Sequence, residues 1–301
     1  MSGFLDDMAS LSASRVAEAI RHESADALER RARRAPRSAP LRLSTLGFDV
    51  IAELKLRSPA AGPLGNERDD WLARVAAYAR GGAAAVSVLT EPSRFDGSLE
   101  HLRKAAAALV PFGVPAMRKD FLVDPYQVLE ARAAGAGGVL VILRMLTRPR
   151  IEQLLDVAAE HGMFVLLEAF DDVDLAVAHD LESSRAARRA GSRAVGAERA
   201  GGKVPAGGDA PAGGEEMILI GVNCRDLQTL QIVNERFAAL APLLPSGWPA
   251  VAESGVASAL DARRMQQLGY RLALIGTALM AREDPSPLLR EIFDATRTVQ
   301  S

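Results

Sequence analysis

The sequence has a single cysteine, Cys224, which excludes an intrachain disulfide and fits a reducing compartment. It has no run of about 18 uncharged apolar residues, so no membrane-spanning helix is expected. The opening stretch, MSGFLDDMASLSASR, carries acids and lacks the apolar core of a secretory signal peptide, which makes the cytoplasm the expected location. The formal net charge is −2, which provides no footprint for nucleic acid or an acidic membrane as a partner.

The basic clusters and the histidines provide little evidence for a partner site or for catalysis. The stretch RRARRAPR, from Arg30 to Arg37, is typical of the solvated end of a helix, although a partner site there stays an alternative. The chain has four histidines, and none of them ends a predicted strand. We therefore expect them at the surface or in helix packing, and not in catalysis. They are His22, His101, His161 and His179.

What the sequence does have is a regular alternation of short apolar runs with amphipathic stretches. The runs are DVIAEL, AAVSVLT, VPAMRK, GVLVIL, MFVLLE, MILIGVN, PAVAES and RLALIG. Eight strand candidates rich in Val, Ile, Leu and Ala, each separated by a helical pattern, predict an α/β protein with a closed parallel (β/α)8 barrel, the TIM-barrel fold. An open doubly wound sheet is the alternative, because periodicity alone cannot show closure.

Two segments fall outside this alternation. Residues 1–47 are predicted to form an N-terminal helical extension, with helices over about 4–34, and residues 48–301 the barrel. Residues 182–216 are rich in Gly, Ala and Arg and lack an apolar periodicity, which predicts a flexible insertion before the sixth strand. Because it precedes a strand, it should emerge on the face opposite a barrel's catalytic face, where a docking role is the alternative to a tolerated loop.

The stretch FDVIAELKLRSP places Glu53 and Lys55 on the same face of a buried strand as Ile51. Burying an unpaired charge costs several kcal/mol, so such a pair is removed, mutually satisfied, or kept for chemistry. Other predicted strands also carry polar residues at their carboxyl ends. These residues are Lys119, Glu168, Asn223, Glu253 and Ser254. The carboxyl ends of a barrel meet at one rim, where catalytic groups of this architecture lie, so we expect the set to be functional.

Two turns in succession indicate a phosphate site. Gly255 in AESGVAS and Gly276 in LIGTALM each lead from a strand into the start of a helix. Backbone N–H groups at such positions bind phosphate, as the loops after strands seven and eight of these barrels often do. Arg225 in NCRDL could add a guanidinium.

Seven segments together resemble the strand-end motifs of the indole-3-glycerol phosphate synthase family. They are VIAELKLRSP, AVSVLTEPSRFDGS, VPAMRKDFLVDPYQVLEARAAGAGGVLVI, LLEAF, IGVNCRDL, VAESGV and LIGTALM. The resemblance covers residues 48–297 apart from the insertion, and RKDF followed by ESG is its most specific part. It implies a lyase of tryptophan biosynthesis that converts 1-(2-carboxyphenylamino)-1-deoxyribulose 5-phosphate into indole-3-glycerol phosphate, carbon dioxide and water, without metal or organic cofactor.

The resemblance also implies roles for individual residues. Lys119 matches the family's general acid, Glu168 the base, and Lys55 the lysine that holds the substrate carboxylate and assists loss of hydroxyl. The residues that would orient these lysines and the substrate hydroxyls are Glu53, Asn223, Glu253 and Ser254. The phosphate would be bound by Arg225, Gly255, Gly276 and Thr277. Ser58 would help with the carboxylate, and Phe95 and Phe121 match residues near the anthranilate ring.

Three departures from the family pattern bear on substrate fit. Cys224 stands where a second Asn is usual, LLEAF replaces Leu-Glu-Val-His, and SPAAG lacks a second Ser. They leave open a paralogue that makes an indole precursor for a secondary pathway. Cys224 could also be a nucleophile, but a small thiol at a strand end is typical of packing.

Two other functions remain as alternatives. One is a sugar-phosphate isomerase such as phosphoribosylanthranilate isomerase, which typically needs a Cys or Asp at the end of strand one, where this chain has Glu53 and Lys55. The other is a catalytically inactive phosphate-binding barrel that acts as a scaffold. A scaffold would have no reason to keep buried ionisable residues, which favours the enzyme.

Overall fold

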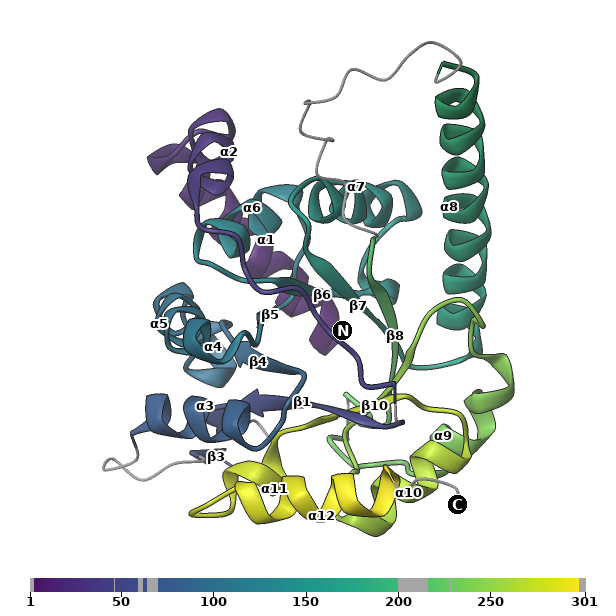
Figure 1. Cartoon of the computed structure of the whole chain (residues 1–301). Helices are drawn as coiled ribbons and strands as arrows, with labels where there is room; N and C mark the ends of the chain where they lie inside the picture. The colour runs from purple at the N-terminus through teal and green to yellow at the C-terminus, as the bar shows by residue number, and fades with distance from the viewer. Residues whose placement is uncertain are drawn as a thin grey trace.

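The computed structural model of the chain describes residues 3–45, 47–58, 62–63, 70–199, 216–227 and 229–297. Eight parallel strands close into a barrel, with β1 hydrogen-bonded to both β4 and β10 (Figure 1). The predicted (β/α)8 barrel is therefore confirmed, and the open sheet is excluded. The barrel strands are β1 (Asp49–Leu54), β4 (Ala85–Leu89), β5 (Ala116–Lys119), β6 (Gly138–Ile142), β7 (Phe164–Ala169), β8 (Ile218–Asn223), β9 (Ala250–Glu253) and β10 (Leu272–Ile275).

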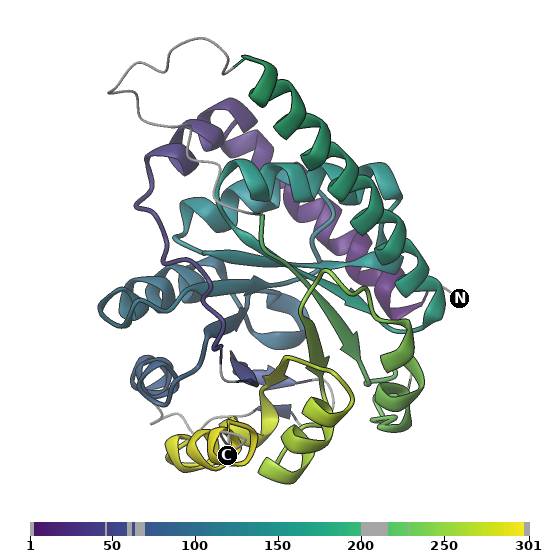
Figure 2. The same ribbon diagram turned by 45° about the vertical axis from the view of Figure 1, so that its right-hand side comes forward.

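Helices surround this barrel, and a short hairpin follows β1 (Figures 1 and 2). The hairpin strands are β2 (Arg57–Ser58) and β3 (Gly62–Pro63). The α-helices are α1 (Phe4–His22), α2 (Ala25–Arg34), α3 (Trp71–Arg80), α4 (Pro92–Phe95), α5 (Leu99–Leu109), α6 (Pro125–Ala133), α7 (Arg148–Glu160), α8 (Asp172–Arg199), α9 (Glu235–Leu240), α10 (Ala259–Gln267), α11 (Thr277–Met280) and α12 (Ser286–Thr296). The 3₁₀ turns are η1 (Val110–Phe112), η2 (Leu143–Met145) and η3 (Ala241–Leu243).

Side chains alternate along β1 as its sequence predicts. Ile51 points into the barrel interior, where it packs with residues such as Leu140 and Leu274. Val50 and Ala52 point outward into the apolar layer between strands and helices. Glu53 lies two residues after Ile51, so it also points into the barrel and away from the helices. Both faces of the strand are buried.

Short-range signals set the helix boundaries. Asp70 accepts hydrogen bonds from the first-turn amides of Leu72 and Ala73, and α3 ends where Gly82 adopts a φ of +91°. Asp124 caps α6 with a bond from the Tyr126 amide, and Pro125 occupies the first helical position.

The expected N-terminal helices are α1 and α2, which lie against the α6–α7 side of the barrel (Figure 2). Tyr126 of α6 donates its hydroxyl proton to the Glu23 carbonyl at 2.9 Å. Arg132 donates to the carbonyls of Ala35 and Pro36, just after α2. The extension is thus bound to the barrel by side chains of α6 as well as by apolar packing.

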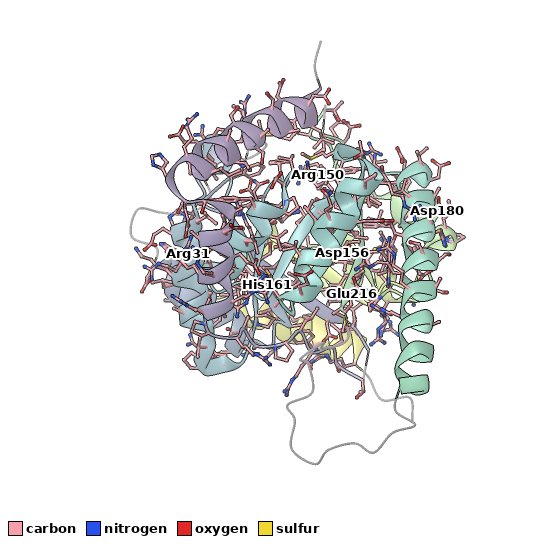
Figure 3. All side chains as sticks on the ribbon, turned by 90° about the horizontal axis from the view of Figure 1, so that it is seen from above. Arg31, Arg150, Asp156, His161, Asp180 and Glu216 are labelled. Carbon is pink, nitrogen blue, oxygen red and sulfur yellow. The ribbon has the colours of Figure 1, made fainter. Side chains whose placement is uncertain are left out.

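Helix α8 corrects the prediction for residues 182–216. It continues to Arg199, so the first part of the supposed flexible segment is helical, and it projects beyond the other elements (Figure 1). Alanine and arginine are strong helix formers, and Arg185 forms ion pairs with Asp156 of α7 and with Glu216. Figure 3 shows Asp156 and Glu216 between α7 and α8. Residues 200–215 lie outside the described residues.

The end of the described chain lies at the start of β1, at the amino-terminal face of the barrel. Arg297, which follows α12, donates to the Asp49 carboxylate at 2.6 Å and to the Phe48 carbonyl at 3.2 Å. Among the described residues, none of the helices has the length and apolar character that crossing a membrane requires.

Candidate active site

A cavity of about 470 Å³ opens at the carboxyl ends of the barrel strands. Nearly all the side chains singled out in the sequence line it, so the predicted convergence on one rim is confirmed. They are Glu53, Lys55, Phe95, Lys119, Phe121, Glu168, Asn223, Arg225, Glu253, Ser254, Gly255, Gly276 and Thr277. Ser58 is placed by its backbone alone, in β2 opposite Gly62. The volume of the cavity is suitable for a small-molecule ligand.

Lys119, at the end of β5, is the central cation of the cavity. Its Nζ lies 2.9 Å from Glu168 Oε2 and 3.3 Å from Glu253 Oε2. Burial by itself would lower the pKa of Lys119, but the surrounding carboxylates, led by Glu168 and Glu253, outweigh it and raise the pKa above its ordinary value. Lys119 is therefore a protonated ammonium group that is fixed in direction by Glu168 and Glu253.

Glu253, at the end of β9, is the most deeply shielded acid beside Lys119. Its side chain is 1% exposed, and burial together with the charge of Glu168 raises its pKa well above the usual range, although Lys119 opposes this. Its Oε1 has no hydrogen-bond partner among the described residues. The cavity thus keeps a proton on both groups: Lys119 stays an ammonium group, and the Glu253 carboxyl group resists ionisation.

Glu53 and Lys55 form the second ion pair of the cavity, with Lys55 Nζ 2.8 Å from Glu53 Oε1. The Glu53 side chain is 5% exposed; burial raises its pKa, but Lys55 and Lys119 outweigh burial and lower it. The two charges on one face of β1 therefore satisfy each other and remain at the cavity. Glu53 and Lys55 are therefore paired with each other and are also part of the cavity lining.

Asn223 links the carboxylates to the next strand connection. Its Nδ2 donates to Glu168 Oε1 at 3.2 Å, and its Oδ1 accepts from the backbone amide of Arg225 at 2.9 Å. The Arg225 guanidinium in turn donates to the Leu230 carbonyl at 2.7 Å. This chain of bonds fixes the glutamate on one side and the arginine on the other.

The β9 and β10 ends form the part of the cavity with exposed backbone. Ser254 and Gly255 have φ values of +65° and +79°, so two successive residues are left-handed directly after β9. Such a conformation turns consecutive N–H groups in one direction and is typical of anion sites. On the neighbouring strand, Gly276 precedes the first turn of α11. The two predicted glycine turns therefore lie side by side.

Aromatic side chains form the opposite wall. Phe95 and Phe121 have ring centroids 6.2 Å apart, and Phe4 contacts Phe121 edge to face at 5.8 Å. Phe4 belongs to α1 and was not singled out in the sequence, where no signal shows which barrel face the extension covers. The other lining residues that sequence reasoning missed are mostly apolar: Leu89, Asp120, Leu140, Ile142, Leu227, Leu230, Ile232, Asn234, Val256, Ala257, Leu274, Ala278 and Ala281.

The departures from the family pattern lie away from the cavity lining where the structure describes them. Cys224 is fully buried in the apolar layer between strands and helices, and burial raises the pKa of its thiol to about 12. This supports packing and not a nucleophile. Phe170 is buried, with the Arg144 guanidinium 4.6 Å from its ring centre. Ala60 of SPAAG lies outside the described residues.

Fold and site together define a (β/α)8-barrel enzyme whose carboxyl-end cavity has paired lysines and glutamates. The sequence profile of indole-3-glycerol phosphate synthase matches residues 5–185 and 216–292. The residues between these ranges have no counterpart in it, as expected for an insertion. The chain belongs to the indole-3-glycerol phosphate synthase family.

Individual relatives agree with this membership. The indole-3-glycerol phosphate synthase of Parafrankia sp. (strain EAN1pec) is 38% identical over 277 residues, which cover 91% of this chain and 89% of that protein. The enzyme of the same name from Nocardioides sp. (strain ATCC BAA-499 / JS614) is 40% identical over 258 residues, covering 85% and 84%.

Solved structures of other proteins share the fold. The 3-hexulose-6-phosphate synthase of Salmonella typhimurium aligns with a TM-score of 0.56 at 12% identity, covering 82% of this chain and 98% of that one. The orotidine 5'-phosphate decarboxylase of Pyrococcus horikoshii OT3 gives 0.54 at 13% identity, covering 83% and 100%. At such low identity the likeness concerns the barrel and not the reaction.

Proposed function

We propose that the chain converts 1-(2-carboxyphenylamino)-1-deoxyribulose 5-phosphate into indole-3-glycerol phosphate, carbon dioxide and water, as a lyase of tryptophan biosynthesis. The observation that carries this proposal is the Lys119 ammonium, held between Glu168 and Glu253 in the cavity. Family membership supports the same reaction and disfavours the sugar-phosphate isomerase.

Lys119 would act as the general acid of ring closure. When the aromatic carbon attacks the ketone, negative charge develops on the ketone oxygen, and the ammonium supplies a proton and a favourable field. Glu168 and Glu253 hold the ammonium in position before the substrate arrives. Carbon dioxide then leaves the ring carbon that formed the new bond, and the electron pair of the broken bond returns to the ring.

Lys55 and Glu168 would complete the dehydration. Lys55 would hold the substrate carboxylate and then assist departure of the hydroxyl group, and Glu168 would take the proton whose removal forms the indole double bond. Glu53 fixes Lys55 at 2.8 Å, and Asn223 fixes Glu168 at 3.2 Å. Lys55 and Glu168 therefore each have a positioning partner, and Ser254, which lines the cavity, would contact the substrate hydroxyls.

The remaining parts of the cavity would bind the two ends of the substrate. The left-handed turn at Gly255, the helix start at Gly276 and Thr277, and the Arg225 guanidinium provide the donors that a phosphate dianion needs. At the other end, Phe95 and Phe121 offer an apolar surface for the aromatic ring. Ser58 would assist Lys55 with the carboxylate. We also propose a cytoplasmic location, which the single cysteine supports.

The direct test is incubation of the purified chain with this substrate while indole fluorescence is followed. We expect a signal that rises with enzyme concentration and carbon dioxide release in equal amount. If no indole fluorescence develops even at high enzyme concentration, the scaffold alternative is favoured. A much better rate with a ring-substituted substrate would instead favour the paralogue of a secondary pathway.

A further inference from the structure

Asp120 directly follows Lys119, and its buried carboxylate accepts four hydrogen bonds. Oδ1 accepts from Arg15 Nη2 at 2.7 Å and from the Phe121 amide at 2.9 Å. Oδ2 accepts from Thr90 Oγ1 at 2.7 Å and from Arg118 Nη2 at 3.0 Å. Both oxygens are thus occupied by protein donors, so this carboxylate is not available as a substrate ligand.

The same bonds join Asp120 to three separate elements. Thr90 follows β4, Arg118 belongs to β5, and Arg15 belongs to α1 of the N-terminal extension. The Thr90 amide also donates to the Lys119 carbonyl at 3.0 Å. Arg118 is 3% exposed and contacts the Gln127 carbonyl and the Glu130 carboxylate of α6 as well. The side chains of the residues on both sides of Lys119 are therefore fixed by charged hydrogen bonds, and the Lys119 carbonyl by a backbone bond.

Helix α1 adds a second contact to the same loop. Ser12, three residues before Arg15 on the same helical face, donates to the Phe121 carbonyl and accepts from Gln127 Nε2 at 2.8 Å. Met8, one turn earlier, is buried with Phe121 in the apolar cluster of the barrel interior. One stripe of α1 therefore covers the loop that follows Lys119.

We propose that Asp120 is a positioning residue for Lys119, and that Arg15 of α1 holds Asp120 in place. This inference rests on the proposed function, in which Lys119 transfers the proton. Burial would raise the pKa of Asp120, but Arg118 and Arg15 outweigh burial and lower it, so the carboxylate stays charged and the clamp stays intact at neutral pH. A catalytic group displaced by about 1 Å can lose about a hundredfold in rate, which is why such a clamp matters.

Arg15→Gln is the primary test. The Arg15 side chain is 29% exposed and Asp120 retains its other three donors, so we expect this variant to fold. We expect kcat to fall about tenfold while KM changes less than about twofold, since the phosphate donors lie on other strands. Arg15→Lys retains a cation and should recover part of the loss. Asp120→Asn should lower kcat too, and the double variant should be no slower than the slower single variant.

Arg31→Gln is the matched control. Arg31 belongs to α2 of the same extension (Figure 3) and pairs with Glu23 at 2.6 Å. Among the described residues it has no hydrogen bond to residues 119–123. Its kcat and KM should equal those of the wild type. An Arg15→Gln enzyme with wild-type kcat, or with a change in KM alone, would overturn the proposal.

A measurement that does not depend on activity separates this inference from the proposed reaction. Hydrogen exchange of the segment 119–123 should accelerate several-fold in Arg15→Gln, with α12 unchanged, and should stay at the wild-type rate in Arg31→Gln. Unchanged exchange in 119–123 would overturn the clamp. An inactive wild-type protein would refute the proposed reaction, and the exchange rates would still decide whether Arg15 fixes the loop.

Discussion

Glu253 extends over Gly221 of the neighbouring strand, so closely that a β-carbon at position 221 would lie 2.0 Å from Glu253 Oε1. In the barrel register Gly221 pairs with Glu168 on its other side. The absence of a side chain at this one position lets two glutamates from β7 and β9 reach the same lysine.

Gly221→Ala should therefore damage the site. Its methyl group must displace the Glu253 carboxylate from its position 3.3 Å from Lys119. We expect a fall in kcat/KM and a loss of about 1–3 kcal/mol in unfolding free energy, as overpacking typically costs. Steady-state fluorescence assays and urea denaturation measure the two effects. Wild-type kinetics in this variant would mean that the position of Glu253 does not matter for turnover.

Lys119→Met should abolish ring closure while leaving phosphate affinity largely intact. The variant loses the only proton donor proposed for the ketone oxygen. We therefore expect kcat to drop by about 10²- to 10⁴-fold. Product affinity, measured by fluorescence titration with indole-3-glycerol phosphate, should change little. Lys119→Arg serves as the matched variant, because it keeps the charge but holds its proton too tightly to transfer it. Turnover that survives in Lys119→Met would show that another group is the acid.

Arg225→Gln tests the phosphate end. Loss of a charged hydrogen bond costs about 1.5–3 kcal/mol, which corresponds to a KM increase of about 10- to 150-fold. The dephosphorylated substrate is the control, since its weaker turnover should be the same in the wild type and in the variant. Equal losses with both substrates would indicate that Arg225 acts through its bond to the Leu230 carbonyl and not on the phosphate.

Glu253→Gln should change how stability depends on pH. The native pKa of Glu253 is raised, so above the ordinary pKa of 4.5 the unfolded chain ionises this group while the folded chain keeps its proton. The folded state then binds more protons, and the wild type loses stability as the pH rises through this window. The loss amounts to about 1.4 kcal/mol for each unit by which the two pKa values differ.

The variant cannot ionise at this position and should lack that loss. Thermal unfolding from pH 4 to pH 8 measures the difference, which should be smallest at the acidic end and should favour the variant at neutral pH. Parallel stability curves for the two proteins would contradict the raised pKa.

Removal of residues 190–215 should leave turnover unchanged. Arg189 of α8 donates to the Glu216 carbonyl at 3.1 Å, so a short glycine linker can join the remaining ends, and the family profile has no counterpart for this segment. Arg185→Ala, by contrast, leaves Asp156 and Glu216 without their shared partner and should lower unfolding free energy by about 1–3 kcal/mol. A large loss of turnover in the deletion variant would show that the insertion contributes to the mouth.

The barrel and most of its cavity could be predicted because both depend on local rules. Alternation along β1 decides that Glu53 follows Ile51 into the interior, and parallel strands bring their carboxyl ends to one face. The placement of α1 could not be predicted. It depends on contacts such as that of Ser12 with Phe121, which are 109 residues apart in sequence and have no periodic pattern.

The extent of α8 was missed for a different reason. Gly191 and Gly196 interrupt its Ala and Arg content and indicate a loop by composition. The helix nevertheless continues to Arg199, because α7 and Glu216 provide carboxylates for the arginines that precede these glycines. Ion pairs with residues outside α8 therefore stabilise the helix where helix propensity alone did not decide between helix and loop.

Phe4 lines the cavity, whereas Arg297 is fixed to Asp49 at the opposite face of the barrel. This polarity matters for anyone who purifies or immobilises the protein. An affinity tag fused ahead of Phe4 would start beside the entrance that the substrate must use, and coupling to a resin through it would crowd that entrance. Attachment behind Arg297 directs the open mouth toward the bulk solution.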